Sequence, residues 1–117
     1  MINYKKVIET FKNDLEDALL ACDIWDKKSD LSLESYNSNP KATALFGSIL
    51  KNFENHLENL GFPKLGKFII ADLDVNSMIV IINLNDNNFM GSLIDSSQVS
   101  LGILINIAIP NVLELYK

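Results

Sequence analysis

Residues 65–95, LGKFIIADLDVNSMIVIINLNDNNFMGSLID, decide the fold of this chain. They predict three consecutive strands, at about 67–73, 78–84 and 89–94, separated by two segments rich in Asn and Asp. Asn and Asp side chains bond to nearby backbone and tolerate positive φ, so these segments are typical of tight turns. The stretch therefore predicts an antiparallel meander of three strands.

The second of these strands is apolar on both of its faces, because residues 78–82 read MIVII without interruption. A strand with one face in water would alternate polar and apolar residues. This strand should therefore lie inside a sheet that is covered on both faces. The segments before and after the meander must supply those covers.

The N-terminal third of the chain predicts one helix and one hairpin. Residues 4–15 place apolar side chains three and four positions apart, which indicates an amphipathic helix with Tyr4, Val7, Ile8, Phe11 and Leu15 on one face. Residues 18–26 and 31–36 read as two strands joined by the polar turn 27–30, KKSD.

A second helix is predicted over residues 40–60. Asn39 is a good N-cap, and Pro40 occupies the first helical position, where its missing N–H costs nothing. Gly61 is expected to end the helix in a left-handed conformation, and Pro63 follows it. The apolar side chains between them recur at helical spacing: Ala42, Leu45, Phe46, Ile49, Leu50, Phe53, Leu57 and Leu60.

The C-terminal segment, residues 97–116, is ambiguous. Apolar residues alternate from Leu101 to Ile109, and isoleucine favours strands. A helix would instead gather one apolar face, and it would supply the cover that the sheet needs. We prefer the helix, with Ser96 or Ser97 as its cap and Pro110 as a kink. Its expected inner face is Leu101, Leu104, Ile105, Ala108, Val112, Leu115 and Tyr116.

The length and net charge of the chain limit the number of domains and the classes of partner that it can have. A chain of 117 residues is expected to form a single domain, residues 1–117. The net charge of −5 disfavours nucleic acid and anionic membranes as partners. No apolar run approaches the ~20 residues of a membrane span, and the N-terminus has no signal-peptide pattern. We expect a cytoplasmic protein, and the lone Cys22 fits a reducing compartment.

No residue pattern predicts catalysis or a cofactor. His56 is the only histidine, and with Cys22 it cannot form a zinc ligand set. The polar run around Asp86 lacks the spacing of a calcium loop, and its residues are better explained as turn formers. The glycines match no phosphate-binding motif, and the serines near residue 96 belong to no Ser-His-Asp grouping. The sequence therefore predicts no cofactor, no metal and no enzymatic activity.

Three local motifs, in this order along the chain, carry a resemblance to a known family. They are ACDIWD at residues 21–26, the capped helix that runs into Leu60 and Gly61, and MGSLID at residues 90–95 followed by LGI at 101–103. With these motifs the chain resembles the roadblock/dynein light chain family, and in particular the bacterial-type roadblock domains that regulate Ras-like small GTPases. One departure is visible: the family often has glycine in the first hairpin turn, where this chain has residues 27–30, KKSD.

The resemblance implies an α+β fold of the profilin and longin type, an α/β/α sandwich around a five-stranded antiparallel sheet in the order 2-1-5-4-3. The middle helix would cover one face, and the first and last helices the other. The first strand of the meander would then be an edge strand.

The function implied by the resemblance is that of a non-enzymatic regulatory or scaffold module that forms a homodimer and binds a Ras-like small GTPase. The edge strand would pair with its copy, and the expected dimer interface comprises Phe46, Leu50, Phe53, Leu57, Phe68 and Ile70. The expected partner-binding residues are Lys51, Asn52, Asn55 and Glu58. The chain has no arginine, so any stimulation of GTP hydrolysis is expected to come from positioning, without an arginine finger. Two alternatives stay open: a profilin-like domain that senses a small molecule in a pocket between sheet and helix, and a structural subunit of a larger assembly.

Overall fold

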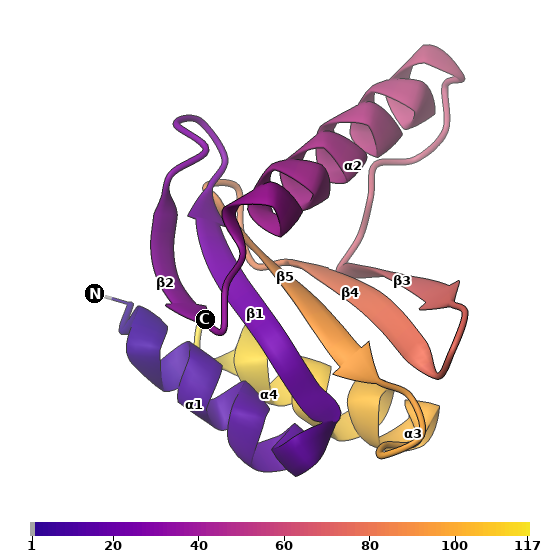
Figure 1. The fold of residues 1–117 in the computed structure, drawn as a ribbon. Helices are drawn as coiled ribbons and strands as arrows, with labels where there is room; N and C mark the ends of the chain where they lie inside the picture. The colour runs from indigo at the N-terminus through magenta and orange to yellow at the C-terminus, as the bar shows by residue number, and fades with distance from the viewer. Residues whose placement is uncertain (1) are drawn as a thin grey trace.

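The computed structural model describes residues 2–117 as one antiparallel sheet with helices on both of its faces (Figure 1). The strand order is β2-β1-β5-β4-β3, as the resemblance implied. The α+β architecture with three main helical segments is confirmed. The elements in chain order are α1 (Tyr4–Leu15), η1 (Glu16–Ala18), β1 (Leu19–Asp26), β2 (Ser32–Tyr36), α2 (Pro40–Asn59), β3 (Phe68–Leu73), β4 (Ser77–Asn83), β5 (Asn88–Asp95), α3 (Leu101–Ile103), η2 (Leu104–Ala108) and α4 (Ile109–Glu114).

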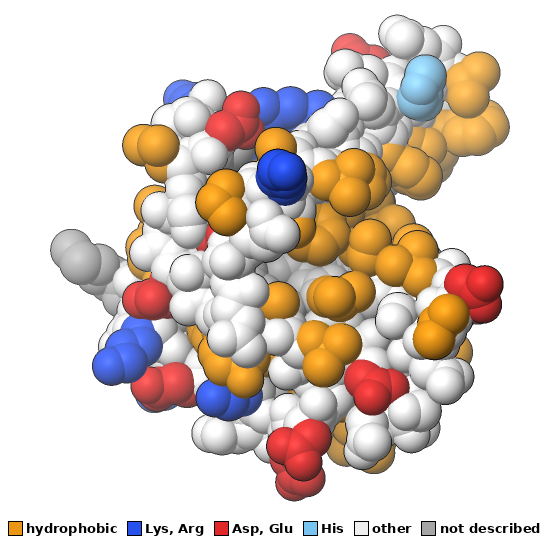
Figure 2. Space-filling view, in the orientation of Figure 1, with side chains coloured by type: hydrophobic (Ala, Val, Ile, Leu, Met, Phe, Trp, Pro, Cys, Tyr) orange, Lys and Arg blue, Asp and Glu red, His pale blue; other side chains and the backbone are white. Residues whose placement is uncertain are grey.

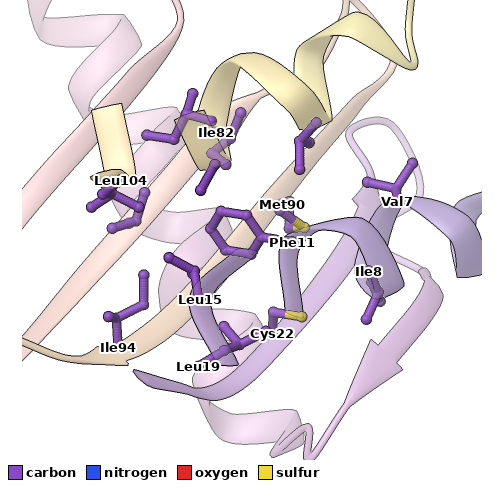
Figure 3. Close-up of a cluster of buried hydrophobic side chains, with 14 of the residues drawn as sticks. Val7, Ile8, Phe11, Leu15, Leu19, Cys22, Ile82, Met90, Ile94 and Leu104 are labelled. Atoms are coloured by element: carbon purple, nitrogen blue, oxygen red, sulfur yellow. The ribbon is translucent and has the colours of Figure 1, made fainter. Parts of the chain in front are cut away.

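The larger hydrophobic core lies between the sheet and the layer formed by α1, η2 and α4. Phe11 of α1, Met90 of β5 and Leu104 of η2 are fully buried there and point toward one another (Figure 3). Met78, Val80 and Ile82 of β4 enter the same core. The prediction that the first and last helices cover one face is therefore confirmed.

A smaller core lies on the opposite face, beneath α2. Trp25 stacks on Phe89, with ring centroids 4.9 Å apart, and meets Phe46 edge to face at 5.7 Å. Ile81 of β4 and Leu50 of α2 complete the cluster of buried side chains. Because β4 sends side chains into both cores, its apolar character on both faces is explained.

The predicted ends of α2 are confirmed. The side chain of Asn39 accepts a hydrogen bond from the backbone N–H of Lys41, Pro40 opens the helix, and Gly61 has a φ of 71°. The first hairpin turn closes without glycine: Asp30 takes a φ of 58°, and the Asp26 carboxylate accepts hydrogen bonds from the N–H and hydroxyl of Ser29. These bonds lower the pKa of the Asp26 carboxyl below its usual value.

The C-terminal helix differs from its prediction in start, shape and inner face. It begins at Leu101, capped by Ser100, four residues later than expected. A π-helical turn, η2, precedes Pro110, and the N–H of Ile109 bonds to the carbonyl of Leu104. This wide turn rotates the helix, so Ile109 is buried while Leu101 and Ile105 are exposed, contrary to the predicted face. Ala18 also differs, because it lies in η1 and not in the first strand.

Candidate interaction surface

Helix α2 covers its face of the sheet only in part. Among the residues of α2, only Phe46, Gly47 and Leu50 are buried. Beyond them Phe53 is 42% exposed, and past the helix end Leu60 and Phe62 are 66% and 59% exposed. The far half of α2 extends away from the sheet (Figure 1). The helix therefore carries apolar side chains that the single chain does not bury.

Strand β3 is an unpaired edge next to this helix face. It pairs with β4 and with no other strand among the described residues. Its first half, Phe68, Ile69 and Ile70, is half-buried and has neither charge nor proline. Native proteins usually protect an edge strand of this kind from pairing with another chain.

The free part of α2 and the adjoining sheet form one apolar surface, and Figure 2 shows hydrophobic side chains gathered along the underside of the helix and over the sheet beside it. Ile69 of β3, Ile79 of β4 and Leu65 before β3 pack beside the smaller core and are only partly buried. Contiguous exposed apolar surface on a small protein indicates an interaction site.

The residues predicted for the dimer interface fall into two groups. Phe46 and Leu50 are 7% and 1% exposed inside the smaller core, so the chain itself already uses them. Phe68 and Ile70, at the β3 edge, pack partly buried against the larger core on the opposite face. On the α2 side, the surface available to a partner is therefore carried by Phe53 and Leu57. The four residues expected to bind a partner are all exposed on α2: Lys51, Asn52, Asn55 and Glu58. Lys51 is held by Asp30, with its Nζ 2.9 Å from Oδ1.

Among residues 2–117, the side chains that could act as nucleophiles or metal ligands do not form a cluster. Cys22 is buried in the larger core, and burial raises the pKa of its thiol to about 12, which keeps it protonated. His56 is exposed on α2. Residues 2–117 contain no group of three or more His, Cys, Asp or Glu side chains that could hold a metal ion. Every helix in this part of the chain is too short or too polar to span a bilayer.

A groove of about 650 Å³ separates the β1–β2 hairpin from the first half of α2. Small side chains on the helix, Thr43, Ala44, Gly47 and Ser48, keep this space open. Asp23 and Trp25 of β1 line it from the sheet. Neither residue was predicted to belong to a site, although the sequence carries one signal: Asp23 is a charged residue within an apolar strand.

Comparisons with known proteins agree on the fold. No protein-family model matches the sequence, and no curated protein matches it. Among solved structures, Myxococcus xanthus MglB is similar with a TM-score of 0.78 at 10% identity, over 97% of this chain and 86% of that chain. A Roadblock/LC7 domain from Streptomyces avermitilis gives a TM-score of 0.71 at 7% identity, over 91% and 90% of the two chains. Schizosaccharomyces pombe profilin gives 0.59 at 10% identity, over 91% and 94%. The chain therefore has the fold of the roadblock/LC7 domain.

Proposed function

We propose that this protein is a non-enzymatic regulator that pairs with itself and binds a Ras-like small GTPase. The observation that carries the proposal is the free β3 edge beside the uncovered apolar half of α2. The fold shared with MglB and with roadblock/LC7 domains supports it. So does the sequence resemblance to GTPase-regulating roadblock domains.

In the proposed dimer, β3 pairs with β3 of a second copy across a two-fold axis. The two sheets then join into one of ten strands, and the two α2 helices lie side by side. Phe53 and Leu57 would lose their exposure to water, and Phe68 and Ile70 would lie at the joined edges. A two-fold contact that uses the same patch on both subunits is the commonest oligomer geometry.

Sedimentation or light scattering at micromolar concentration tests the pairing. The parent protein should give the mass of a dimer, and Phe53→Glu should give a monomer with an unchanged circular dichroism spectrum. Leu33→Lys is the matched control, because Leu33 is 37% exposed on β2, the opposite edge strand. A parent that stays monomeric would contradict the proposed pairing.

Binding to the GTPase is proposed to use the polar side of α2, where Lys51, Asn52, Asn55 and Glu58 are exposed. An arginine finger would raise GTP turnover by roughly 10³ to 10⁵, but this chain has no arginine. Lysine presents a compact charge without the planar fork and is a poor substitute. We propose that any acceleration comes from holding the GTPase's own switch residues in a productive arrangement.

The test has two stages. Cell extract is first passed over the immobilised protein in the presence of GTPγS or GDP, and a small GTPase should be retained preferentially with GTPγS. GTP turnover by that GTPase is then measured with Lys41→Ala, Lys51→Ala, Lys64→Ala and Lys67→Ala. If one variant alone abolishes turnover while binding is retained, that lysine acts as a finger and positioning is the wrong account.

A further inference from the structure

The groove between the hairpin and α2 contains a buried carboxylate without a counter-ion. Asp23 is 4% exposed and accepts hydrogen bonds from Ser32 Oγ at 2.5 Å, Ser38 Oγ at 2.7 Å and Thr43 Oγ1 at 3.0 Å. Within residues 2–117 no Lys or His nitrogen lies within 4.0 Å of it. A buried charge is normally paired with an opposite charge, because removing it from water is costly.

The three hydroxyl groups satisfy Asp23 only in part. They join β1 to β2, to the following loop and to α2, but they bring no positive charge. A carboxylate has about four acceptor positions. Oδ2 receives two of the three bonds and Oδ1 receives one, so Oδ1 has a free position.

Trp25, which lines the same groove, carries a buried polar atom without a partner. Trp25 is 1% exposed, and its indole Nε1–H has no acceptor. The Cζ3 edge of the ring faces β5, where a Cβ on Gly91 would lie 2.8 Å from Cζ3. The Nε1 atom lies at the opposite end of the indole from Cζ3, and Trp25 is one of the residues that line the groove. An unpartnered buried donor costs free energy unless an acceptor is supplied.

We propose that this groove binds a ligand that carries a guanidinium group and a carbonyl oxygen, as arginine does within a peptide or as an amide. The guanidinium pairs with Asp23 at Oδ1, and the carbonyl accepts the hydrogen bond of Trp25 Nε1–H. Guanidinium is less strongly hydrated than ammonium and suits a buried ion pair. The volume of about 650 Å³ is typical of ligand sites, and the net charge of −5 attracts a cation. The chain has no arginine of its own to fill the site.

Nuclear magnetic resonance can follow binding at this groove, because Trp25 is the only tryptophan and gives a single indole N–H resonance. The probes are L-argininamide and the peptide acetyl-Gly-Arg-Gly-amide. L-citrullinamide is the control ligand, because its side chain has nearly the same shape without the charge. Both arginine probes should shift the indole resonance saturably, and L-citrullinamide should bind at least about tenfold more weakly than L-argininamide.

The variant Asp23→Asn removes the charge, and the three hydroxyl groups can turn to bond the amide. It should weaken binding of L-argininamide by about tenfold or more. Asp86→Asn, in the turn before β5, is the matched control and should bind like the parent. Tighter binding of the peptide than of L-argininamide would identify a partner's arginine as the source, and equal binding a free small molecule.

Three results would overturn the proposal. One is that neither arginine probe shifts the indole resonance. The second is that L-citrullinamide binds as well as L-argininamide. The third is that folded Asp23→Asn binds L-argininamide like the parent. The comparison of ligands uses the parent protein alone, so the proposal can be tested even if the variant does not fold.

Discussion

At the scale of single residues, Gly91 shows how tightly the smaller core is packed. A Cβ at this position would lie 2.5 Å from Cδ2 of Phe46 and 2.8 Å from Cζ3 of Trp25. Both are ring atoms held by aromatic contacts, so neither can move without disturbing the other. The absence of a side chain at Gly91 is therefore what allows α2 to approach the sheet.

We expect Gly91→Ala to lower the free energy of unfolding by about 1–3 kcal/mol through overpacking. Gly47→Ala is the control, because a Cβ at Gly47 would lie 3.8 Å or more from its nearest neighbours and alanine favours a helix. Chemical denaturation followed by Trp25 fluorescence measures both variants. Equal stability of Gly91→Ala and the parent would show that the aromatic cluster is not rigid.

Cys22 gives a pH dependence with a definite sign. Its thiol has an ordinary pKa of 9.0, and burial raises this to about 12 in the folded chain. Between these two values the unfolded chain loses the proton and the folded chain keeps it. The stability that the protonated Cys22 thiol gives the folded chain is therefore fully present below pH 9. This stability is lost as the pH rises toward 12.

The measurement compares unfolding of the parent and of Cys22→Ala from pH 8 to pH 10.5. The variant lacks this thiol, so its stability should fall less steeply with pH, although its overall stability is lower. The native thiol should also resist aromatic disulfide reagents at pH 8 until denaturant is added. Rapid labelling of the folded protein would be inconsistent with burial.

At the scale of elements, the β3–β4 turn carries backbone strain. Val75 and Asn76 have φ values of 57° and 53°. Asparagine tolerates this left-handed conformation, but a β-branched residue does so only at a cost. Val75 is 83% exposed, so no buried contact compensates for the strain. The sequence predicted a turn here and could not show which residue would be strained.

We expect Val75→Asn to raise the free energy of unfolding by about 1 kcal/mol, because it relieves the strain without removing a packed side chain. Val75→Thr keeps the branched Cβ and should leave stability close to that of the parent. Thermal unfolding of the three proteins provides the comparison. A melting temperature of Val75→Asn at or below that of Val75→Thr would show that the backbone at Val75 is not strained.

Elements with strong local signals were predictable, and those shaped by tertiary context were not. Asn39, Pro40 and Gly61 fix the ends of α2, because caps act within one turn of the chain. The alternation from Leu101 to Ile109 fits neither a plain strand nor a plain helix. The π-helical turn at η2 resolves it by burying Leu104 and Ala108 together with Ile109. Such a turn depends on packing against the sheet, which the local pattern does not encode.

The site was predictable only in part, for the same reason. The exposure of the polar residues of α2 follows from helical spacing, and the free edge at β3 follows from the strand order that the family resemblance implied. The burial of Phe46 depends on Trp25 and Phe89, which are distant in sequence. The groove around Asp23 depends on hydroxyl groups from β2, the following loop and α2. Long-range contacts of this kind become visible only in the folded chain.

At the scale of the whole molecule, the two cores are unequal. The layer of α1, η2 and α4 buries side chains along its whole length, whereas α2 buries three residues. Apolar burial is the main source of stability. The sheet with the first layer should therefore be the more stable part, and α2 the less stable one.

This inequality predicts that α2 opens separately from the rest of the fold, as a unit of local unfolding. In native-state amide hydrogen exchange of the monomeric Phe53→Glu variant, the amides of residues 44–59 should exchange with a lower opening free energy than those of β5 and α1. Equal protection of α2 and β5 would contradict this picture. A partner that binds α2 would then slow exchange across the whole helix while leaving the sheet unchanged. Occupancy of the helix could thus be followed from its amide protection alone, residue by residue, even for a partner that is itself invisible to the measurement.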